Sequence, residues 1–342
     1  MNVLIGANGS GKSNFLQFFR LLQNMMDFHK GLQNHVREKG GSDSFLFRGS
    51  KISQEFSAGL WLKDAVYRTT LRAAADKSMF LAREEILVLA PKGTHQEDLL
   101  ISILNREGQT ESKLRHNTEL TQLEKTIATT VKSWGFYHFH DTSANAGIMG
   151  PCNALDSHRL RSDAANISGF LRKIRDRHSS HYARIVETIR LAAPFFGEFV
   201  LDEVAPGQTQ LLWQERYADP IFYPHQLSDG TLRFICLVTL LLQPTPPSTL
   251  LIDEPELGLH PYAIELLAGL LREASTRCQL IVSTQSMQLV NELDPEDLIV
   301  VDRKDGETTF SRHNSEELAT WLEEYSLGEL WNKNVLGGRP QA

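Results

Sequence analysis

Residues 6–13 read Gly-Ala-Asn-Gly-Ser-Gly-Lys-Ser, and this stretch decides the fold. It follows a short apolar run, Val3–Ile5, and precedes an amphipathic run that begins at Asn14 and extends to about Met26. This order predicts a strand, a glycine loop and a helix, which is the context that a phosphate-binding loop requires. Glycines let the chain curl with its N–H groups pointing inward, and the helix adds the positive end of its dipole.

The residue types in this loop predict how it binds a nucleotide. Lys12 can reach the β- and γ-phosphates, and the Ser13 hydroxyl can complete a Mg²⁺ shell with phosphate oxygens and waters. The strand before the loop and the helix after it disfavour the alternative, a glycine turn with a surface lysine. ATP and Mg²⁺ are therefore the predicted cofactors, and the predicted nucleotide ligands are Gly6, Ala7, Asn8, Gly9, Ser10, Gly11, Lys12, Ser13 and Asn14.

Composition limits the class of protein. The 342 residues are 41% hydrophobic and 23% charged, as in an ordinary globular protein, and the net charge of −7 argues against a generally basic nucleic-acid binder. Cys152, Cys236 and Cys278 are far apart, so neither a disulfide framework nor a zinc site is expected. No signal peptide is recognisable, and the longest apolar run, Phe234–Leu242, is too short to span a membrane. We expect a cytoplasmic protein without a membrane partner.

A second apolar run, Thr249–Ile252, ends in two carboxylates, Asp253 and Glu254. A P-loop ATPase needs this arrangement, because Asp253 would hold the Mg²⁺ shell and Glu254 would orient and polarise the attacking water. The alternative is a strand that runs into an acidic turn, and the run alone does not separate the two.

The segment Leu227–Thr231, LSDGT, opens an apolar helix about twenty residues before Asp253. Ser228, Asp229 and Gly230 at a helix N-terminus would make a tip that senses phosphate. Taken by itself, the segment is better explained as a simple serine N-cap.

Together these segments resemble the ATP-binding-cassette (ABC) ATPases, specifically the soluble RecF-like and structural-maintenance-of-chromosomes (SMC) relatives. GANGSGKSN matches the Walker A motif, LSDGT matches the signature that is usually LSGG, and LLIDEPELGLHP matches Walker B with the D-loop. The GLHP ending is typical of RecF-like and stand-alone AAA-type ATPases. The resemblance covers the whole chain in order. It implies that two subunits close head to tail on two ATP molecules, with Ser228, Asp229 and Gly230 of each contacting nucleotide.

The resemblance implies an α/β P-loop NTPase of the ABC type, with a mixed central sheet, an antiparallel strand insertion at about 45–90 and a helical signature lobe. The nucleotide-binding lobe is expected at residues 1–141 and 245–336, and the helical lobe at 142–244. In the sequence itself, loosely alternating residues separated by turns predict the insertion as an antiparallel meander of Phe45–Phe47, Ile52–Leu62, Ala65–Ala73 and Met79–Leu89.

Periodicity predicts the remaining elements. Helices are expected over Thr118–Val131, Leu155–Leu191, Pro261–Ala274 and Glu316–Tyr325, and Gln226–Leu242 is expected to be a loop that leads into a long apolar helix. Strands are expected over Trp134–His140, Phe199–Trp213, Ile221–Tyr223, Ser248–Ile252 and Leu280–Ser283. Leu298–Asp302 and Thr308–Arg312 predict a hairpin around Asp305-Gly306, and residues 337–340 are expected to be loose.

The chain departs from the family pattern at three places. Where the family often has a switch histidine it has Gln285, which can donate to a γ-phosphate oxygen and completes the predicted catalytic set with Lys12 and Glu254. Where a Q-loop glutamine is expected, the chain has His140 and Asp141. Either residue could replace the glutamine, or each could simply cap the loop. His138 and His140 share a strand face and permit a metal site, but further ligands are lacking. Finally, Met1 lies five residues before the loop, so the strand that often helps hold adenine is missing, or the start lies upstream.

Eight basic side chains and three acidic ones give residues 159–190 a local charge of +5. A solvated helix face is the favoured explanation, and weak nucleic-acid binding through residues 159–190, or docking of an acidic partner, is the alternative. The basic residues are Arg159, Arg161, Arg172, Lys173, Arg175, Arg177, Arg184 and Arg190, and the acidic ones are Asp163, Asp176 and Glu187.

The function that these observations favour is a cytosolic ATPase that dimerises on ATP and separates on hydrolysis, as a switch on DNA or on an effector protein. The resemblance implies DNA repair or defence against phage and plasmids, since many stand-alone relatives serve there. LSDGT, GLHP, the strand insertion and the missing Q-loop glutamine disfavour an ATPase subunit of a membrane transporter. The dedicated signature helix disfavours a P-loop kinase. The lack of coiled-coil arms argues against DNA tethering of the chromosome-maintenance type.

Overall fold

The computed structural model describes residues 1–88, 100–105, 107–116 and 119–339. The chain folds into two compact units. The first unit comprises Met1–Leu16 and Gly135–Ala342, and the second comprises Gln17–Trp134. The predicted division into a nucleotide lobe and a helical lobe at 142–244 stays a prediction, since both predicted lobes contribute residues to the first compact unit.

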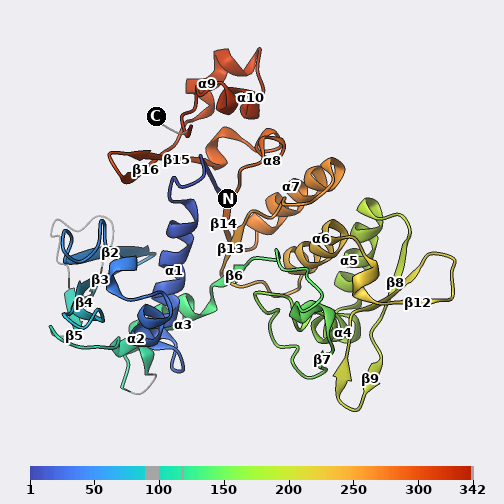
Figure 1. The fold of residues 1–342 in the computed structure, drawn as a ribbon, viewed down its shortest axis with the longest axis horizontal. Coiled ribbons are helices and arrows are strands. Elements are labelled where there is room, and N and C mark those ends of the chain that lie inside the picture. Colours follow the sequence, from blue (N-terminus) through green and yellow to red (C-terminus); the bar gives the residue numbers. More distant parts are fainter. Residues whose placement is uncertain (89–99, 106, 117–118, 340–342) are drawn as a thin grey trace. The chain divides into compact units, whose positions relative to one another are not determined.

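A six-stranded mixed sheet organises the first unit, in the order β16-β15-β1-β14-β13-β6. The strands β15, β1, β14, β13 and β6 run parallel, and β16 closes the sheet in an antiparallel hairpin with β15 (Figure 1). Their bounds are β1 Asn2–Ile5, β6 Gly135–Tyr137, β13 Thr249–Asp253, β14 Gln279–Ser283, β15 Leu298–Lys304 and β16 Glu307–Ser311. Buried strands of continuous apolar residues are typical of parallel sheets, and the sheet confirms the predicted mixed α/β fold.

The predicted hairpin around Asp305-Gly306 is confirmed. Both turn residues have positive φ, +54° and +88°, which is what a two-residue hairpin turn of the right twist requires.

The helices of the first unit are amphipathic or wholly apolar. α6 is buried over most of its length, as its apolar sequence predicts, and it packs against α5 and α7 (Figure 1). The helices begin and end at α1 Lys12–Met26, α4 Ile167–Arg177, α5 Ser179–Ala192, α6 Asp229–Leu241, α7 Pro261–Ser275, α8 Met287–Asn291, α9 Ser315–Leu322 and α10 Leu327–Asn332. α1 begins in the first unit and continues into the second.

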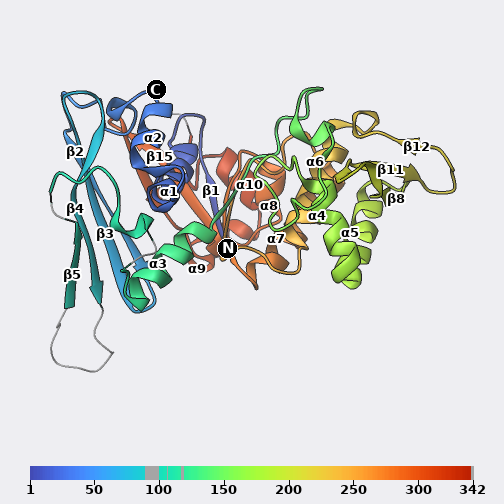
Figure 2. The ribbon, with the colours of Figure 1, turned by 90° about the horizontal axis from the view of Figure 1, so that it is seen from below.

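The second unit contains the predicted antiparallel insertion. Its four strands follow one another in the order β2-β3-β4-β5, seen side by side in Figure 2. The strands are β2 Glu55–Leu62, β3 Ala65–Ala73, β4 Met79–Val88 and β5 Leu100–Asn105, and the unit adds α2 Gly31–Glu38 and α3 Gln122–Ser133. Helix α3 begins after Thr121, which forms a capping box with Glu124, and the predicted start at Thr118 lies outside the described residues.

Several local predictions are wrong. Residues 45–47 form turns, not a strand. The predicted helix over 155–191 is two helices, α4 and α5, and residues 155–166 are irregular because the buried Asn166 side chain bonds the backbone of Asp156, Arg159 and Arg161. The predicted strand over 134–140 is only β6. Residues 199–213 break into short strands: β8 Phe196–Val200, β9 Glu203–Ala205, β10 Gln208–Thr209 and β11 Leu212–Glu215.

Smaller features complete the described chain. β7 Cys152–Asn153 pairs with β10, and β12 Ile221–Phe222 pairs with β11. The Gly338 N–H donates to Asp302 Oδ1 at 2.9 Å, so this part of the segment predicted to be loose is held, while Pro340 and Leu89 lie outside the described residues. Within the described ranges, no helix has the length and apolar character needed to cross a membrane.

Candidate functional site

The loop between β1 and α1 has the backbone that only glycines adopt easily. Gly6, Gly9 and Gly11 have φ of +150°, +79° and +113°. A β-carbon on Gly6 would lie 2.2 Å from the Val301 carbonyl oxygen, so the close approach of β15 also requires glycine there. The loop residues 6–11 therefore form the predicted curl at the carboxyl end of β1.

The Lys12 side chain folds back onto the carbonyls of this loop. Its Nζ donates to the Gly6 carbonyl at 2.6 Å and to the Ala7 carbonyl at 2.9 Å, and the side chain is buried. Burial lowers the pKa of Lys12, while the carboxylates of Glu254, Asp253 and Glu256 act in the opposite direction. The Lys12 ammonium thus lies in the loop that would bind phosphates. Bound phosphate oxygens, which are charged, would accept hydrogen bonds from it more strongly than the Gly6 and Ala7 carbonyls do.

Ser13 and Asp253 meet although they are far apart in the sequence. The Ser13 hydroxyl donates to Asp253 Oδ2 at 3.4 Å, and the Ser283 hydroxyl donates to Asp253 Oδ1. Asp253 is opposite Ser283 in the register of β13 and β14. One carboxylate and one hydroxyl are too few for an all-protein cation site, but they fit Mg²⁺, which takes its other ligands from water and phosphate.

Glu254 is held in a strained backbone conformation. Its φ is +44°, which is uncommon for a residue with a long side chain, and its N–H donates to the Ser283 carbonyl at 2.9 Å. The Gln285 side-chain amide donates to Glu254 Oε1. The two residues predicted to act on water and γ-phosphate are therefore in direct contact.

Sequence reasoning missed Glu256. Its Oε1 accepts from the Thr284 hydroxyl and from the Gln285 N–H, so it fixes the segment that carries Gln285. Its Oε2 is buried and has no hydrogen-bond partner among the described residues. Burial raises the pKa of Glu256. The signal was present as a third carboxylate directly after Pro255.

The residues at the expected Q-loop position lie beside this cluster. The rings of His138 and His140 are 3.7 Å apart, and His140 Nε2 lies 3.3 Å from the Glu254 carbonyl oxygen. Burial and the neighbouring His140 lower the pKa of His138. Asp141 caps its own loop, accepting from the Ser143 N–H and hydroxyl at 3.0 and 2.7 Å. Within the described ranges, no group of three His, Cys, Asp or Glu residues could hold a metal ion.

The predicted phosphate-sensing tip has the form expected of a helix cap. The Ser228 Oγ lies before α6, accepts from the Thr231 N–H at 3.2 Å and lies 2.8 Å from the Thr231 Oγ1. Asp229 and Gly230 form the first turn of α6, and a β-carbon on Gly230 would lie 2.4 Å from the Gly258 carbonyl oxygen. The structure therefore brings this tip against the D-loop of its own chain, and the hydrogen bonds of Ser228 stay within the helix cap.

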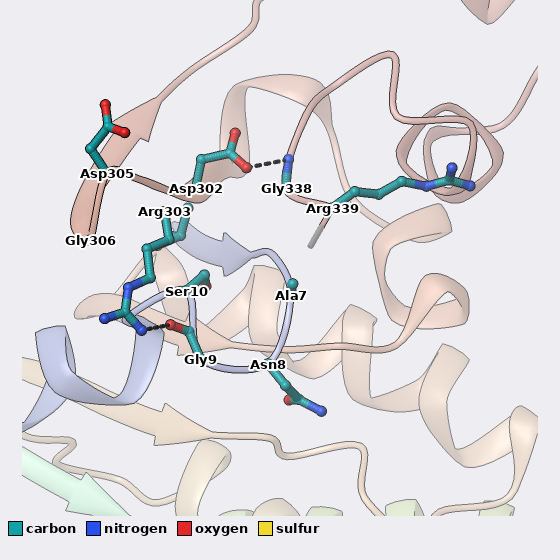
Figure 3. A pocket seen from close by; sticks show the side chains of 11 residues that line it. Ala7, Asn8, Gly9, Ser10, Asp302, Arg303, Asp305, Gly306, Gly338 and Arg339 are labelled. Atoms are coloured by element: carbon teal, nitrogen blue, oxygen red, sulfur yellow. Dashed lines mark hydrogen bonds between the residues drawn. The ribbon is translucent and has the colours of Figure 1, made fainter. Parts of the chain in front are cut away.

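A pocket of about 400 Å³ lies beside the loop, on the side of β15. Ala7, Asn8, Gly9 and Ser10 form one wall (Figure 3). The β15–β16 hairpin and the Gly338-Arg339 segment form the others. Arg303 Nη1 lies 3.5 Å from the Gly9 carbonyl oxygen, and the Thr308 hydroxyl donates to the Ser10 carbonyl at 2.8 Å, so the hairpin supports the loop directly.

Comparison with known proteins gives a family and a fold. Residues 1–291 match the family described as "AAA domain, putative AbiEii toxin, Type IV TA system". An SMC head, solved bound to the C-winged helix domain of ScpA, superposes with a TM-score of 0.52 over 93% of this chain and 91% of that one. At 16% identity this likeness concerns the fold.

Two curated relatives match shorter parts of the chain. Both are described as "Putative ABC transporter ATP-binding protein". The protein from Methanosarcina acetivorans is 33% identical over 78 residues, or 22% of this chain and 28% of its own length. The protein from Geobacter sulfurreducens is 33% identical over 100 residues, or 28% of this chain and 39% of its own length. The matches therefore span well under half of each relative.

Proposed function

Because the chain belongs to the AAA domain family whose description names a putative AbiEii toxin of a type IV system, we propose that it binds and hydrolyses Mg²⁺-ATP at the loop of residues 6–13. The observation that carries this proposal is the Ser13–Asp253 contact. This contact joins the end of the glycine loop to the end of β13. Lys12, Glu254 and Gln285 therefore lie near the same two residues.

The chain's own side chains divide the chemistry between them. Lys12 binds the β- and γ-phosphates, and the backbone N–H groups of residues 8–13 hold the phosphate oxygens. Ser13 and Asp253 would hold Mg²⁺, which when bound neutralises phosphate charge. Glu254 orients the attacking water and takes its proton, while Gln285 holds the Glu254 carboxylate and donates to the γ-phosphate.

The proposed cycle includes dimerisation. Ser228 and Gly230 lie at the N-terminus of α6, where a hydroxyl and an amide suit a γ-phosphate. We propose that this tip acts on the nucleotide of a second subunit, with the Ser228 hydroxyl still serving as the cap of its own helix. We propose head-to-tail closure on two ATP molecules, followed by separation on hydrolysis.

Loss of the phosphate and metal contacts tests the ATPase proposal. Lys12→Ala removes the charge facing the β- and γ-phosphates, and Asp253→Asn weakens the metal shell. We expect both to lower ATP hydrolysis by about 100-fold or more, measured as phosphate release. Lys333→Ala, an exposed lysine beside Tyr325, is the matched control and should keep wild-type activity. Full activity in Lys12→Ala would contradict the proposal.

We further propose that the ATP cycle switches an effector protein, in defence against phage or plasmids or in DNA repair, within the cytoplasm. The family description, with its toxin of a type IV system, supports the defence role. Purification from the native cell in the presence of ATP, followed by mass spectrometry, tests it. Recovery of a soluble effector that is released by hydrolysis is the expected result.

The second candidate is the ATPase subunit of a membrane transporter, which the descriptions of the two curated relatives favour. These matches cover about a quarter of the chain, whereas the AAA domain match covers residues 1–291. Co-purification with a membrane-spanning subunit from detergent-solubilised membranes would establish the transporter instead.

A further inference from the structure

The side chain of Arg233 joins three segments near the proposed catalytic carboxylate. Arg233 lies in α6, and its guanidinium donates through Nη1 to the Leu257 carbonyl at 3.0 Å and through Nη2 to the His140 carbonyl at 2.9 Å. Leu257 belongs to the turn that follows Glu254, and His140 lies just beyond β6. One guanidinium therefore ties the signature helix to the D-loop and to the segment at the expected Q-loop position.

The two residues that accept from Arg233 also meet each other at Glu254. The Glu254 carbonyl oxygen accepts from the Leu257 N–H at 3.2 Å. The same oxygen lies 3.3 Å from His140 Nε2. The contacts therefore close into a ring that surrounds the Glu254 carbonyl, and the guanidinium of Arg233 completes this ring.

This ring accounts for the strained backbone of Glu254. A φ of +44° persists in a residue with a long side chain only where its surroundings fix the backbone. The Glu254 N–H is fixed by the Ser283 carbonyl at 2.9 Å, and the Glu254 carbonyl is fixed by the ring that Arg233 closes. Because the backbone angles of Glu254 set the direction of its carboxylate, loss of the ring would let the carboxylate turn away from the attacking water.

The D-loop is shaped to admit the guanidinium. A β-carbon on Gly258 would lie 2.5 Å from Arg233 Nη1, and the φ of Gly258 is +76°. Glycine is thus required there both by the backbone and by Arg233. The Arg233 Nε is buried and has no hydrogen-bond partner among the described residues, so the guanidinium makes its bonds to the two carbonyls at the cost of an unpaired donor.

We propose that Arg233 is a positioning residue for ATP hydrolysis, an inference that rests on the proposed function. Arg233 acts through Glu254: it holds the turn after β13 so that the carboxylate faces the attacking water. Its role therefore concerns the rate of hydrolysis, while binding of the phosphates belongs to residues 6–13.

Arg233→Met and Arg277→Met form a matched pair. Arg277 also donates to two backbone carbonyls, those of Leu241 and Gln243, but these lie at the carboxyl end of α6. We expect Arg233→Met to slow single-turnover hydrolysis at saturating ATP at least about tenfold and to leave the affinity for ATP within about twofold of the wild type. Arg277→Met should keep the wild-type rate. Arg233→Lys, whose ammonium lacks the fork of a guanidinium, should fall between the wild type and Arg233→Met.

A second pair of variants leaves Arg233 in the chain. Gly258→Ala places a methyl group against the guanidinium, and we expect it to slow hydrolysis at least about tenfold, as Arg233→Met does. Gly207→Ala is its control, because Gly207 has nearly the same φ, +72°, and no atom within 4 Å of the position of a β-carbon. This pair separates displacement of the guanidinium from backbone strain.

A double-mutant cycle tests whether Arg233 acts through Glu254. In the Glu254→Gln chain, which lacks the carboxylate, Arg233→Met should slow the remaining hydrolysis by less than about twofold. A further tenfold loss there, wild-type rates in both Arg233→Met and Gly258→Ala, or an equal loss in Arg277→Met would overturn the positioning role. If the wild-type chain hydrolyses no ATP, the proposed function itself fails, and the positioning role with it.

Discussion

Gln285 stands where related ATPases often carry a histidine, and its amide donates to the catalytic candidate Glu254. Because an amide cannot take a proton, its contribution is to orient the carboxylate and to donate a hydrogen bond. We expect Gln285→Ala to weaken ATP binding modestly, because one hydrogen bond to the γ-phosphate is lost, and to slow hydrolysis at least about tenfold. Gln285→Glu should be slower still, because it places a second negative charge beside Glu254. Single-turnover rates at saturating ATP give the measurement, and equal rates in all three proteins would refute the role.

His35 gives stability a dependence on pH. It is 3% exposed, its Nδ1 lies 2.8 Å from the Asn24 amide nitrogen, and burial lowers its pKa to about 4. The unfolded chain binds this proton near pH 6.5, so the stabilisation is present above pH 6.5 and is lost as the pH falls towards 4. His35→Gln should flatten the loss between about pH 7.5 and about pH 5, measured by urea unfolding. The exposed His29→Gln is the control, and unchanged slopes in His35→Gln would contradict the assignment.

The sequence identifies candidate residues of the site better than it identifies the residues that hold them in place by hydrogen bonds. Lys12 and Ser13 lie in a run whose strand–loop–helix context predicts their role, whereas Asp253 and Glu254 were assigned only once all the motifs were considered together. Glu256 could not be assigned the same way, because its role depends on Thr284 and Gln285, which reach it only across the sheet.

Elements with a strong apolar run are predicted nearly to the residue. β13, β14 and α7 deviate from their predicted bounds by a residue or so, because continuous apolar strands and a proline at a helix start are local signals. The helix predicted through residues 155–166 fails because the buried amide of Asn166 takes the backbone groups that a helix would use. α2, β5, α8 and α10 were not predicted.

The basic residues of 159–190 lie mainly on two helices, α4 and α5, and the question is whether they bind nucleic acid. The arginines are partly paired within the chain: Arg172 with Glu203, Arg175 with Asp176 and Arg184 with Glu273. We therefore expect no DNA or RNA binding in a gel-shift assay at low salt, with or without ATP. Binding that falls with salt and disappears when Arg172, Lys173 and Arg175 are reversed to glutamate would instead establish a phosphate-contacting surface.

At the scale of the whole molecule, the decisive question is whether ATP makes two subunits form a dimer. Glu254→Gln keeps the shape of the side chain and removes its charge, so we expect it to bind ATP, hydrolyse it about 100-fold more slowly and accumulate as a dimer. Light scattering with and without ATP gives the measurement. A monomer at saturating ATP would refute the dimer mechanism.

Mixed subunits test whether active sites are shared. Ser228→Arg should bind ATP like the wild type but neither dimerise nor hydrolyse, because the tip is blocked. Mixing it with Lys12→Ala gives dimers in which one composite site has both defects and the other has none, so activity should return. Ser326→Arg, which removes the serine cap of α10, controls for the loss of a helix cap. Failure of the mixture to regain activity would argue against shared sites.

The strand pairing of β1 also determines at what stage of synthesis the loop can gain its support. Asn2 pairs with Ile281 and Val3 with Leu298, so β1 has no strand neighbour until residues 279–304 have left the ribosome. The glycine loop is translated among the first residues of this sequence, yet its walls come from some of the last. We therefore expect a chain that ends before residue 279 to lack both strand neighbours of β1, and with them the support of the glycine loop.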